Sequence, residues 1–335
     1  MSRSSYGYAV SRIRAMEHLL LDVGLFQRML DVDDLTGALK ILGETVYGRN
    51  IDANTGERYD GALEAELLSL YDDMRTFVPD EGLIDICRLS YDFHNVKVIL
   101  KSAINARNGG KKRWDLLTKL GTIDTDNLIV QLESEDYPLL RYGLSSLIPA
   151  CMTQWDQTRD IVEVERMLDE GLFAAMSLVA AEIGEPGVIA WVSARIDAEN
   201  IRNLLRLKRF GFDAAKAAAF MHKGGTVTPD ALIQLLPEQF DSWGRMIGYT
   251  NVGAAIAKVQ DDGDFDDLMV SLEKALDDYC RDVLSNARYS ANAPENVLAY
   301  IWGKEMEVKN IRTVLVSKGA GGDREATRRM LRHGY

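Results

Sequence analysis

Apolar residues recur at helical spacing along most of the chain, and no convincing alternating strand pattern of useful length interrupts them. Over residues 4–21, for example, Tyr8, Ile13, Met16 and Leu20 fall at helical spacing. Glycine and proline separate such segments and predict where helices start and stop. We therefore expect an all-α fold. The main predicted helices cover residues 4–21, 23–31, 33–42, 59–76, 80–107, 186–211, 265–289 and 294–319.

One nine-residue pattern occurs three times on these predicted helices. It reads acid-x-x-Asn-(Val/Ile)-(Lys/Arg)-x-x-Leu, and its asparagines are Asn95, Asn200 and Asn310. Their separations, 105 and 110 positions, are nearly equal. A repeat of this length is too long for an ordinary solenoid unit, so we interpret it as one small helical unit used three times.

Prolines support the triplication. Pro79, Pro186 and Pro294 lie 16, 14 and 16 positions before the three asparagines. Proline is well suited to the first turn of a helix, because its missing N–H is not needed there. Each asparagine is therefore expected about four turns into its helix.

A second, shorter pattern lies further upstream of each asparagine. Leu21-Asp22 recurs as Leu168-Asp169 and, more weakly, as Leu276-Asp277. From this aspartate to the motif asparagine is 73, 31 and 33 positions in turn. The additional 40 or so residues of the first copy include a stretch rich in turn-forming residues, about 43–58, which we expect to be an exposed loop.

These repeats predict three domains. The first helical unit spans residues 1–120 with the inserted loop, and the second spans 121–225. The third spans 226–335 and ends in a short basic helix that contains Arg324, Arg328 and Arg329.

A helical wheel places the motif asparagine in the middle of an apolar stripe. In the second copy, Ile196 and Leu204 flank Asn200 on either side. The acid three positions before falls about 60° away, at the edge of that stripe. A buried asparagine must find hydrogen-bond partners, or its burial costs roughly 1–3 kcal/mol.

We therefore interpret acid and asparagine as a structural clamp that locks each motif helix to its own unit. The alternative, a binding or catalytic asparagine, stays open. The clamp residues are Asp92, Asn95, Asp197, Asn200, Glu307 and Asn310.

The basic residue two positions after each asparagine falls about 200° from it, on the opposite face of the helix. These residues are Lys97, Arg202 and Arg312. They are expected either on a solvated helix face or on a surface that three similar helices present to a partner.

Charge and cysteine content narrow the function. The net charge of −12 repels phosphate backbones and argues against nucleic-acid binding. Three widely spaced cysteines fit buried thiols in a reducing compartment. No apolar run reaches membrane-spanning length, and the first residues lack the apolar core of a signal peptide. A cytoplasmic, non-spanning protein is expected.

Motifs for chemistry are missing from the sequence. It contains no phosphate-binding Gly-x-x-x-x-Gly-Lys-(Ser/Thr) loop, no zinc spacing among its four histidines and three cysteines, and no Gly-x-Ser-x-Gly elbow. Carboxylates are plentiful, but none forms a recognisable acid/base pair. We expect no catalytic residue, no metal site and no cofactor.

The three motif helices resemble those of the C subunits of the V-type and A-type rotary ATPases, which correspond to the d subunit of the eukaryotic enzyme. The stretch Ala299-Tyr-Ile-Trp-Gly-Lys-Glu-Met-Glu-Val-Lys-Asn-Ile-Arg312 is the most diagnostic. The other matching stretches run from Tyr91 to Lys101 and from Ile196 to Lys208. The resemblance covers essentially the whole chain.

The resemblance implies three similar helical units arranged as a funnel around a pseudo-threefold axis. It implies a socket in the central stalk, on the cytoplasmic side of the membrane. The socket receives the shaft, formed by the D and F subunits, and couples its rotation to the proteolipid ring during ATP-driven ion transport or ATP synthesis. No catalytic residue or cofactor is implied. A free-standing adaptor for another helical partner and an all-α enzyme with an acidic active site are the competing interpretations.

Overall fold

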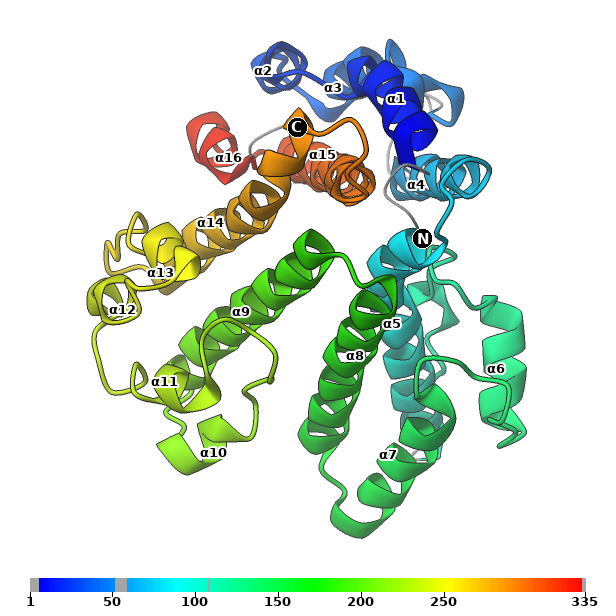
Figure 1. Ribbon diagram of the computed structural model, residues 1–335, viewed down its shortest axis with the longest axis vertical. Helices are drawn as coiled ribbons and strands as arrows, with labels where there is room; N and C mark the ends of the chain where they lie inside the picture. Colours follow the sequence, from blue (N-terminus) through cyan, green and yellow to red (C-terminus); the bar gives the residue numbers. More distant parts are fainter. Residues whose placement is uncertain (1–5, 52–58, 108, 333–335) are drawn as a thin grey trace. The chain divides into compact units, whose positions relative to one another are not determined.

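The computed structural model describes residues 6–51, 59–107 and 109–332. Every regular element within these ranges is a helix (Figure 1), which confirms the expected all-α class for this part of the chain. Contacts divide the chain into two compact units, one formed by Glu81–Gly184 and the other by Met1–Asp80 with Glu185–Tyr335. The three ranges expected from the sequence stay a prediction.

The unit Glu81–Gly184 is built around the first motif helix. Its long helices α5 and α8 lie side by side, and α7 packs on α8 (Figure 1). Phe93 and Val96 of α5 and Met176 of α8 are among its buried apolar side chains. The helices are α5 (Gly82–Arg107), the 3-10 turn η4 (Trp114–Leu116), α6 (Thr125–Glu133), α7 (Leu144–Thr158) and α8 (Ile161–Ile183).

Local sequence sets the boundaries of α8 and of the next helix. The carboxylate of Asp160 accepts hydrogen bonds from the backbone N–H groups of Val162 and Glu163, so it caps the start of α8. Gly184 ends α8 with a φ of 73°, a left-handed conformation that glycine adopts without a steric penalty. Pro186 then occupies the first turn of α9.

The second unit contains the other two motif helices. Helix α9 lies along α14, and Trp191 of α9 meets Trp302 of α15 edge to face with ring centroids 5.8 Å apart. The helices from residue 185 onward are α9 (Pro186–Arg209), α10 (Ala214–Ala218), α11 (Pro229–Ile233), α12 (Phe240–Met246), α13 (Asn251–Ile256), α14 (Phe265–Ser285), the 3-10 turn η5 (Asn286–Tyr289), α15 (Glu295–Ala320) and α16 (Arg324–Met330).

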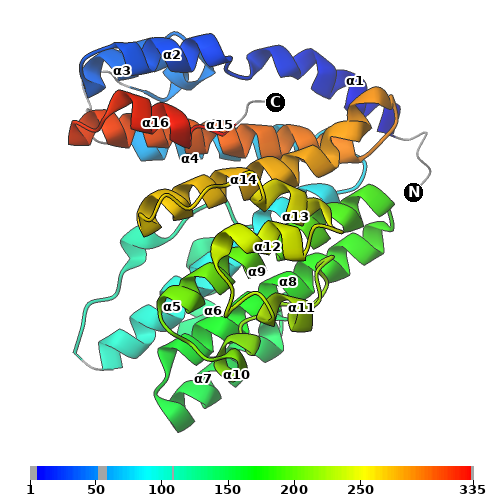
Figure 2. The ribbon, with the colours of Figure 1, turned by 90° about the vertical axis from the view of Figure 1, so that its left-hand side faces the viewer.

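The N-terminal part of this unit packs against α15. Figure 2 shows α1, α2 and α3 alongside α15 and α16, and each of α1 to α4 contacts α15. Of the turn-rich stretch 43–58, residues 46–49 form the 3-10 turn η3, and 52–58 lie outside the described residues. The N-terminal elements are α1 (Gly7–Met16), η2 (Glu17–Leu19), α2 (Val23–Asp31), α3 (Leu35–Gly43), η3 (Val46–Arg49) and α4 (Tyr59–Arg75).

The three motif helices have the expected length and position. They contain 26, 24 and 26 residues. Pro186 and Pro294 lie at the starts of α9 and α15, as expected. Pro79 differs, because α5 begins only at Gly82. Each asparagine therefore lies well inside a long helix.

Candidate functional site

Each motif asparagine binds the backbone of a single residue further along the chain. The Nδ2 group of Asn95 donates to the carbonyl of Thr118 at 2.8 Å, and its Oδ1 accepts from the Thr118 N–H at 3.0 Å. Asn200 makes the same two bonds with His222, at 2.8 and 2.7 Å. Both asparagines are fully buried. One side chain thus satisfies a donor and an acceptor of a segment that is in neither helix nor strand.

Asn310 repeats this arrangement with Arg332, at 3.0 and 2.9 Å. The residue bound lies 22 or 23 positions after the asparagine in all three copies. A paired donor and acceptor on both sides fixes the register of the segment, because a shift by one residue breaks both bonds. The clamp role assigned from the sequence stays a prediction about energy. The three asparagines do bind a segment that follows their own helix.

The motif acid of the first copy binds the same returning segment. Asp92 accepts hydrogen bonds from the hydroxyl of Thr122 at 2.7 Å and the N–H of Ile123 at 3.0 Å. A Cβ atom on Gly121 would lie 2.4 Å from the Asp92 Oδ1 atom, so only glycine lets the backbone come this close. Asp92 therefore holds a Gly-Thr-Ile turn that follows the Thr118 contact.

The second copy uses the same turn. Asp197 accepts from the N–H groups of Thr226 and Val227, at 3.0 and 3.1 Å, and from the Thr226 hydroxyl. A Cβ atom on Gly225 would lie 2.3 Å from Asp197 Oδ1. The sequence Gly-Thr-(Ile/Val) thus recurs 26 and 25 positions after Asn95 and Asn200. Reading the sequence missed this signal, although the short repeat is present in it.

Burial shapes the electrostatics of these two acids. It raises the pKa of Asp92 and of Asp197, although the hydrogen bonds from the Gly-Thr-(Ile/Val) turns work in the opposite direction. Their carboxylates are therefore ionised at some cost in the folded protein.

The third copy has glutamate in place of aspartate, and its partners differ. Glu307 accepts from the hydroxyl of Tyr47 at 2.7 Å, from the ammonium group of Lys304 at 2.8 Å and from the N–H of Leu21. Lys304, Tyr47 and Glu307 are all buried. The longer acid thus reaches residues of the N-terminal helices.

The motif bases of the first two copies form ion pairs within their own units. In α5, Lys97 pairs with Asp169 and Lys101 pairs with Glu165 at 2.6 Å, so two charges one turn apart meet two charges on α8. These side chains are between about a quarter and a half exposed. They hold α5 and α8 in register.

The same arrangement of two ion pairs one turn apart, here called a ladder, recurs between α9 and α14. Arg202 lies 3.9 Å from Asp277, and Arg206 pairs with Glu273 at 3.2 Å. Arg202 also pairs with Glu199, and only 17% of its side chain is exposed. Arg202 is thus the least accessible of the three motif bases.

Arg312 has a different environment. Its partner is Asp60 of α4 at 2.8 Å, and the two side chains are 50% and 63% exposed. The ladder is absent one turn later, where Val316 takes the place of Lys101 and Arg206. Contact between any of these bases and a partner protein stays a prediction.

Asp277 is the centre of a buried ionic cluster. Lys309 approaches it at 2.7 Å and Arg332 at 3.0 Å, in addition to Arg202. Burial alone would raise the pKa of Asp277, but the charges of Lys309 and Arg332 outweigh burial and lower it. The cluster ties α9, α14, α15 and the segment after α16 together.

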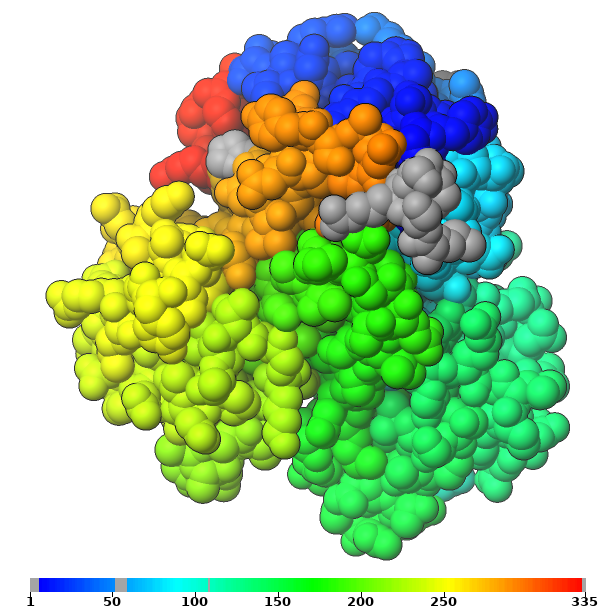
Figure 3. Space-filling model, viewed as in Figure 1, coloured from blue at the N-terminus to red at the C-terminus, as the bar shows by residue number. Residues whose placement is uncertain are grey.

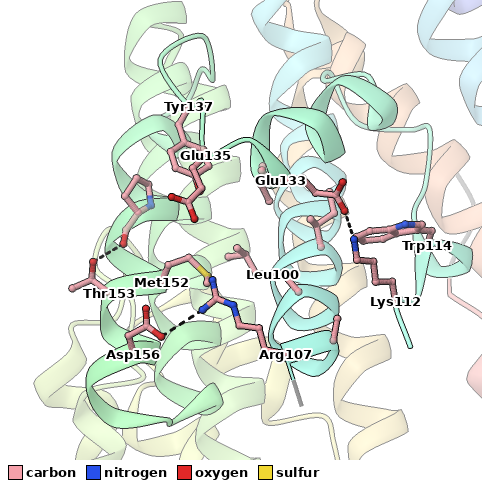
Figure 4. A pocket seen from close by; sticks show the side chains of 15 residues that line it. Leu100, Arg107, Lys112, Trp114, Glu133, Glu135, Tyr137, Met152, Thr153 and Asp156 are labelled. Atoms are coloured by element: carbon pink, nitrogen blue, oxygen red, sulfur yellow. Dashed lines mark hydrogen bonds and ion pairs between the residues drawn. The ribbon is translucent and has the colours of Figure 1, made fainter. Parts of the chain in front are cut away.

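The unit Glu81–Gly184 contains a groove of about 590 Å³ lined by residues of α5, α6 and α7 (Figure 4). Leu100 and Met152 contribute to its apolar lining. Charged pairs lie along it, Arg107 with Asp156 at 3.5 Å and Lys112 with Glu133. The lining combines apolar and charged side chains and indicates no particular reaction.

Side chains suited to metal binding do not gather in the part of the chain that the structure describes. No cluster of three or more histidine, cysteine, aspartate or glutamate side chains there could hold a metal ion. The cysteines Cys87, Cys151 and Cys280 are buried. Likewise, none of the helices described has both the length and the apolar character that crossing a bilayer requires.

Comparison with known proteins places nearly the whole chain in one family. The sequence model of the ATP synthase (C/AC39) subunit family matches residues 9–330. The C subunit of the V-type sodium ATPase of Enterococcus hirae is 23% identical over 91% of this chain and 92% of its own length.

Two further relatives are C subunits of the same kind. The C subunit of the A-type ATP synthase of Desulfurococcus sp. is 25% identical over 95% of this chain and 89% of its own length. The C subunit of the V-type ATP synthase of Thermus thermophilus is 25% identical over 66% of this chain and 68% of its own length.

Proposed function

Because the chain belongs to the ATP synthase (C/AC39) subunit family, we propose that it is a non-catalytic rotor subunit of a V/A-type rotary ATPase. The observation that carries the proposal is the extent of the match, residues 9–330, together with relatives that are C subunits and are covered over most of their length. All three motif helices lie inside this range.

The proposed position is the central stalk at the cytoplasmic face of the membrane. There the protein serves as a socket between the shaft, formed by the D and F subunits, and the proteolipid ring. In this proposal three similar helical units form a funnel with pseudo-threefold symmetry. The activity served is ATP-driven ion transport or ATP synthesis, and the chain needs no cofactor of its own.

The physical support is stiffness. A part that transmits torque must resist twisting, and helices of 24 to 26 residues clamped to their surroundings at mid-length suit that task. The clamps at Asn95, Asn200 and Asn310 satisfy buried backbone groups, and the ladders beside Lys97 and Arg202 fix neighbouring helices in register. These features favour a rigid coupling element.

The decisive test is capture of the full-length tagged chain from native membranes in mild detergent, with its companions identified by mass spectrometry. Shaft and proteolipid subunits are expected. Membranes that lack the chain should still hydrolyse ATP, but hydrolysis should no longer drive ion movement. A fully coupled complex assembled without the chain would contradict the proposal. Capture of a different helical partner without ATPase subunits would favour the adaptor interpretation.

A charge reversal tests the motif base that is most exposed. Arg312→Glu should weaken assembly of the complex while the fold is retained, because this side chain is half exposed. Asp60→Asn is the matched control, since it removes the same ion pair and leaves the positive charge in place. Equal loss of assembly in both variants would assign the effect to the ion pair and exclude a direct role for Arg312.

A further inference from the structure

Two of the Leu-Asp elements contact the motif helix that precedes them in sequence, and the later of the two also contacts the motif helix that follows it, through Lys309. Leu168-Asp169 lies on α8, and Asp169 pairs with Lys97 of the preceding motif helix, α5. Leu276-Asp277 lies on α14, and Asp277 meets Arg202 of the preceding motif helix, α9. Each of these two motif helices thus forms ion pairs with the long helix that comes after it.

The remaining Leu-Asp element, Leu21-Asp22, contacts the remaining motif helix, α15. It lies at a break between η2 and α2, where Leu20 is extended and Asp22 caps α2 by accepting from the Leu25 N–H at 2.8 Å. The N–H of Leu21, at this break, donates to Glu307. Each of the three motif helices therefore contacts a Leu-Asp element of another copy, and the first element contacts the third motif helix.

Contacts of the N-terminal helices extend along most of α15. The Tyr300 hydroxyl donates to the carbonyl of Met16 at 3.3 Å near one end, and the Lys318 ammonium donates to the carbonyl of Leu30 at 2.8 Å near the other. Between them, side chains of α15 meet those of η3 and α4. These pairs are Tyr47 with Glu307, Tyr71 with Glu305, Glu66 with Lys304 and Asp60 with Arg312.

We propose that the described residues between 6 and 75, the N-terminal strap, complete the third motif unit by closing on α15, and that Glu307 is the residue that holds the strap. Along the chain, residues 76–81 link the strap to the following helix α5. The contacts between the strap and α15 described above are all non-covalent. Figure 3 shows the blue N-terminal residues abutting the orange residues of the α15 region.

The chemistry of Glu307 explains why this copy carries the longer acid. Aspartate at the other two positions reaches a turn of its own returning segment, whereas Glu307 must span to a neighbouring helix layer. Lys304, whose side chain is only 3% exposed, donates to the same carboxylate as Tyr47 and Leu21, so three donors meet on Glu307. Opening the strap would return these buried polar groups to water. The non-covalent boundary between strap and α15 is therefore where the unit can open while the asparagine clamps stay closed.

The test uses the full chain with a protease site inserted between Asp80 and Glu81, ahead of the first residue of α5. After cleavage, residues 1–80 should remain bound in buffer and leave in a single transition as urea is added. Glu307→Gln should lower the urea concentration of release. It should also speed hydrogen exchange of the Leu21 amide about tenfold, because a charged acceptor is lost.

Asp92→Asn is the matched control, because Asp92 occupies the same motif position in the unit Glu81–Gly184. It should leave release of residues 1–80 unchanged. If Glu307→Gln fails to fold, Tyr47→Phe removes one bond to the same carboxylate and should shift release in the same direction. The proposal is overturned if residues 1–80 leave without denaturant, or if Asp92→Asn promotes release as much as the Glu307 or Tyr47 variant does. Neither outcome depends on which complex the chain joins.

Discussion

Helices α9 and α15 carry the same motif, but the motif acids on the two helices have different hydrogen-bond partners. On α9, Asn200 and Asp197 both bind the segment that returns after the helix. On α15, Asn310 binds the segment after α16, whereas Glu307 binds the N-terminal strap. The asparagine keeps its function in both regions, and the acid changes partner.

The bases differ as well. Arg202 is 17% exposed among carboxylates of α9 and α14, whereas Arg312 is 50% exposed beside one exposed aspartate. A repeated residue therefore need not have a repeated role. Its role depends on which other segments of the same chain pack against it. The acid, asparagine and base positions of the motif therefore differ in how strictly the fold requires them.

The asparagine should show the largest effect and the same effect in both regions. Asn200→Leu and Asn310→Leu each leave a buried backbone N–H and C=O without a partner, so we expect each to lower the free energy of unfolding by roughly 2–4 kcal/mol. Urea denaturation measures this. Asn203→Leu, on the same helix as Asn200, is the control and should stay within about 0.5 kcal/mol of wild type. An Asn200 variant no less stable than the Asn203 variant would remove the clamp interpretation.

The acids should not be interchangeable. Asp197→Glu adds a methylene where Gly225 already approaches closely, and Glu307→Asp shortens the reach to Leu21 and Tyr47. We expect each change to cost about 1–3 kcal/mol.

Hydrogen exchange should locate the two effects in different places. The Asp197 variant should loosen the turn around Thr226, and the Glu307 variant should loosen the strap. Loosening of the same segment in both variants would mean that the two acids share a role after all.

Replacing the motif bases should affect stability differently on α9 and on α15. Arg202→Met should lower stability by about 1–2 kcal/mol, because it leaves Glu199 half-buried without its ion-pair partner. Arg312→Met should stay within about 0.5 kcal/mol of wild type, as is usual for an exposed pair. Thermal denaturation of both variants, with Lys40→Met as an exposed control on α3, tests this. Equal losses at Arg202 and Arg312 would mean that exposure does not distinguish them.

The motif helices and the environment of the asparagine could be predicted from the sequence. Helical periodicity fixes which residues share a face, so the burial of Asn95, Asn200 and Asn310 followed from their apolar neighbours. The all-α class followed in the same way, for the residues described.

The partners of the motif residues could not be predicted in this way. A wheel describes one helix and says nothing about the segment that returns 22 residues later, because long-range contact depends on tertiary packing. The Gly-Thr-(Ile/Val) turns are too short to stand out before their contact with the acid is known. The contact of Leu21 with Glu307 of α15 joins residues 286 positions apart, and nothing in local sequence specifies it.

The smallest expected effect concerns pH, and here Asp197 and Asp277 should behave in opposite ways. Burial raises the pKa of Asp197, so protonation favours the fold. As the pH falls through that raised value towards the ordinary aspartate value near 3.9, wild type should gain stability relative to Asp197→Asn. The pKa of Asp277 is lowered against the effect of burial by Lys309 and Arg332. Its stabilisation is complete above the ordinary value and is lost as the pH falls below it.

Urea denaturation of wild type, Asp197→Asn and Asp277→Asn from about pH 7 to about pH 3.5 measures both slopes. Differences against wild type cancel the titration of other groups, leaving changes of roughly a few tenths to 1 kcal/mol. The stability of wild type relative to Asp197→Asn should rise in mild acid, and that relative to Asp277→Asn should fall only at the acid end. Parallel slopes would show that burial, and not the cations around Asp277, governs both carboxylates. The Asp277 cluster would then be a packing feature and not an electrostatic joint between α9, α14 and α15.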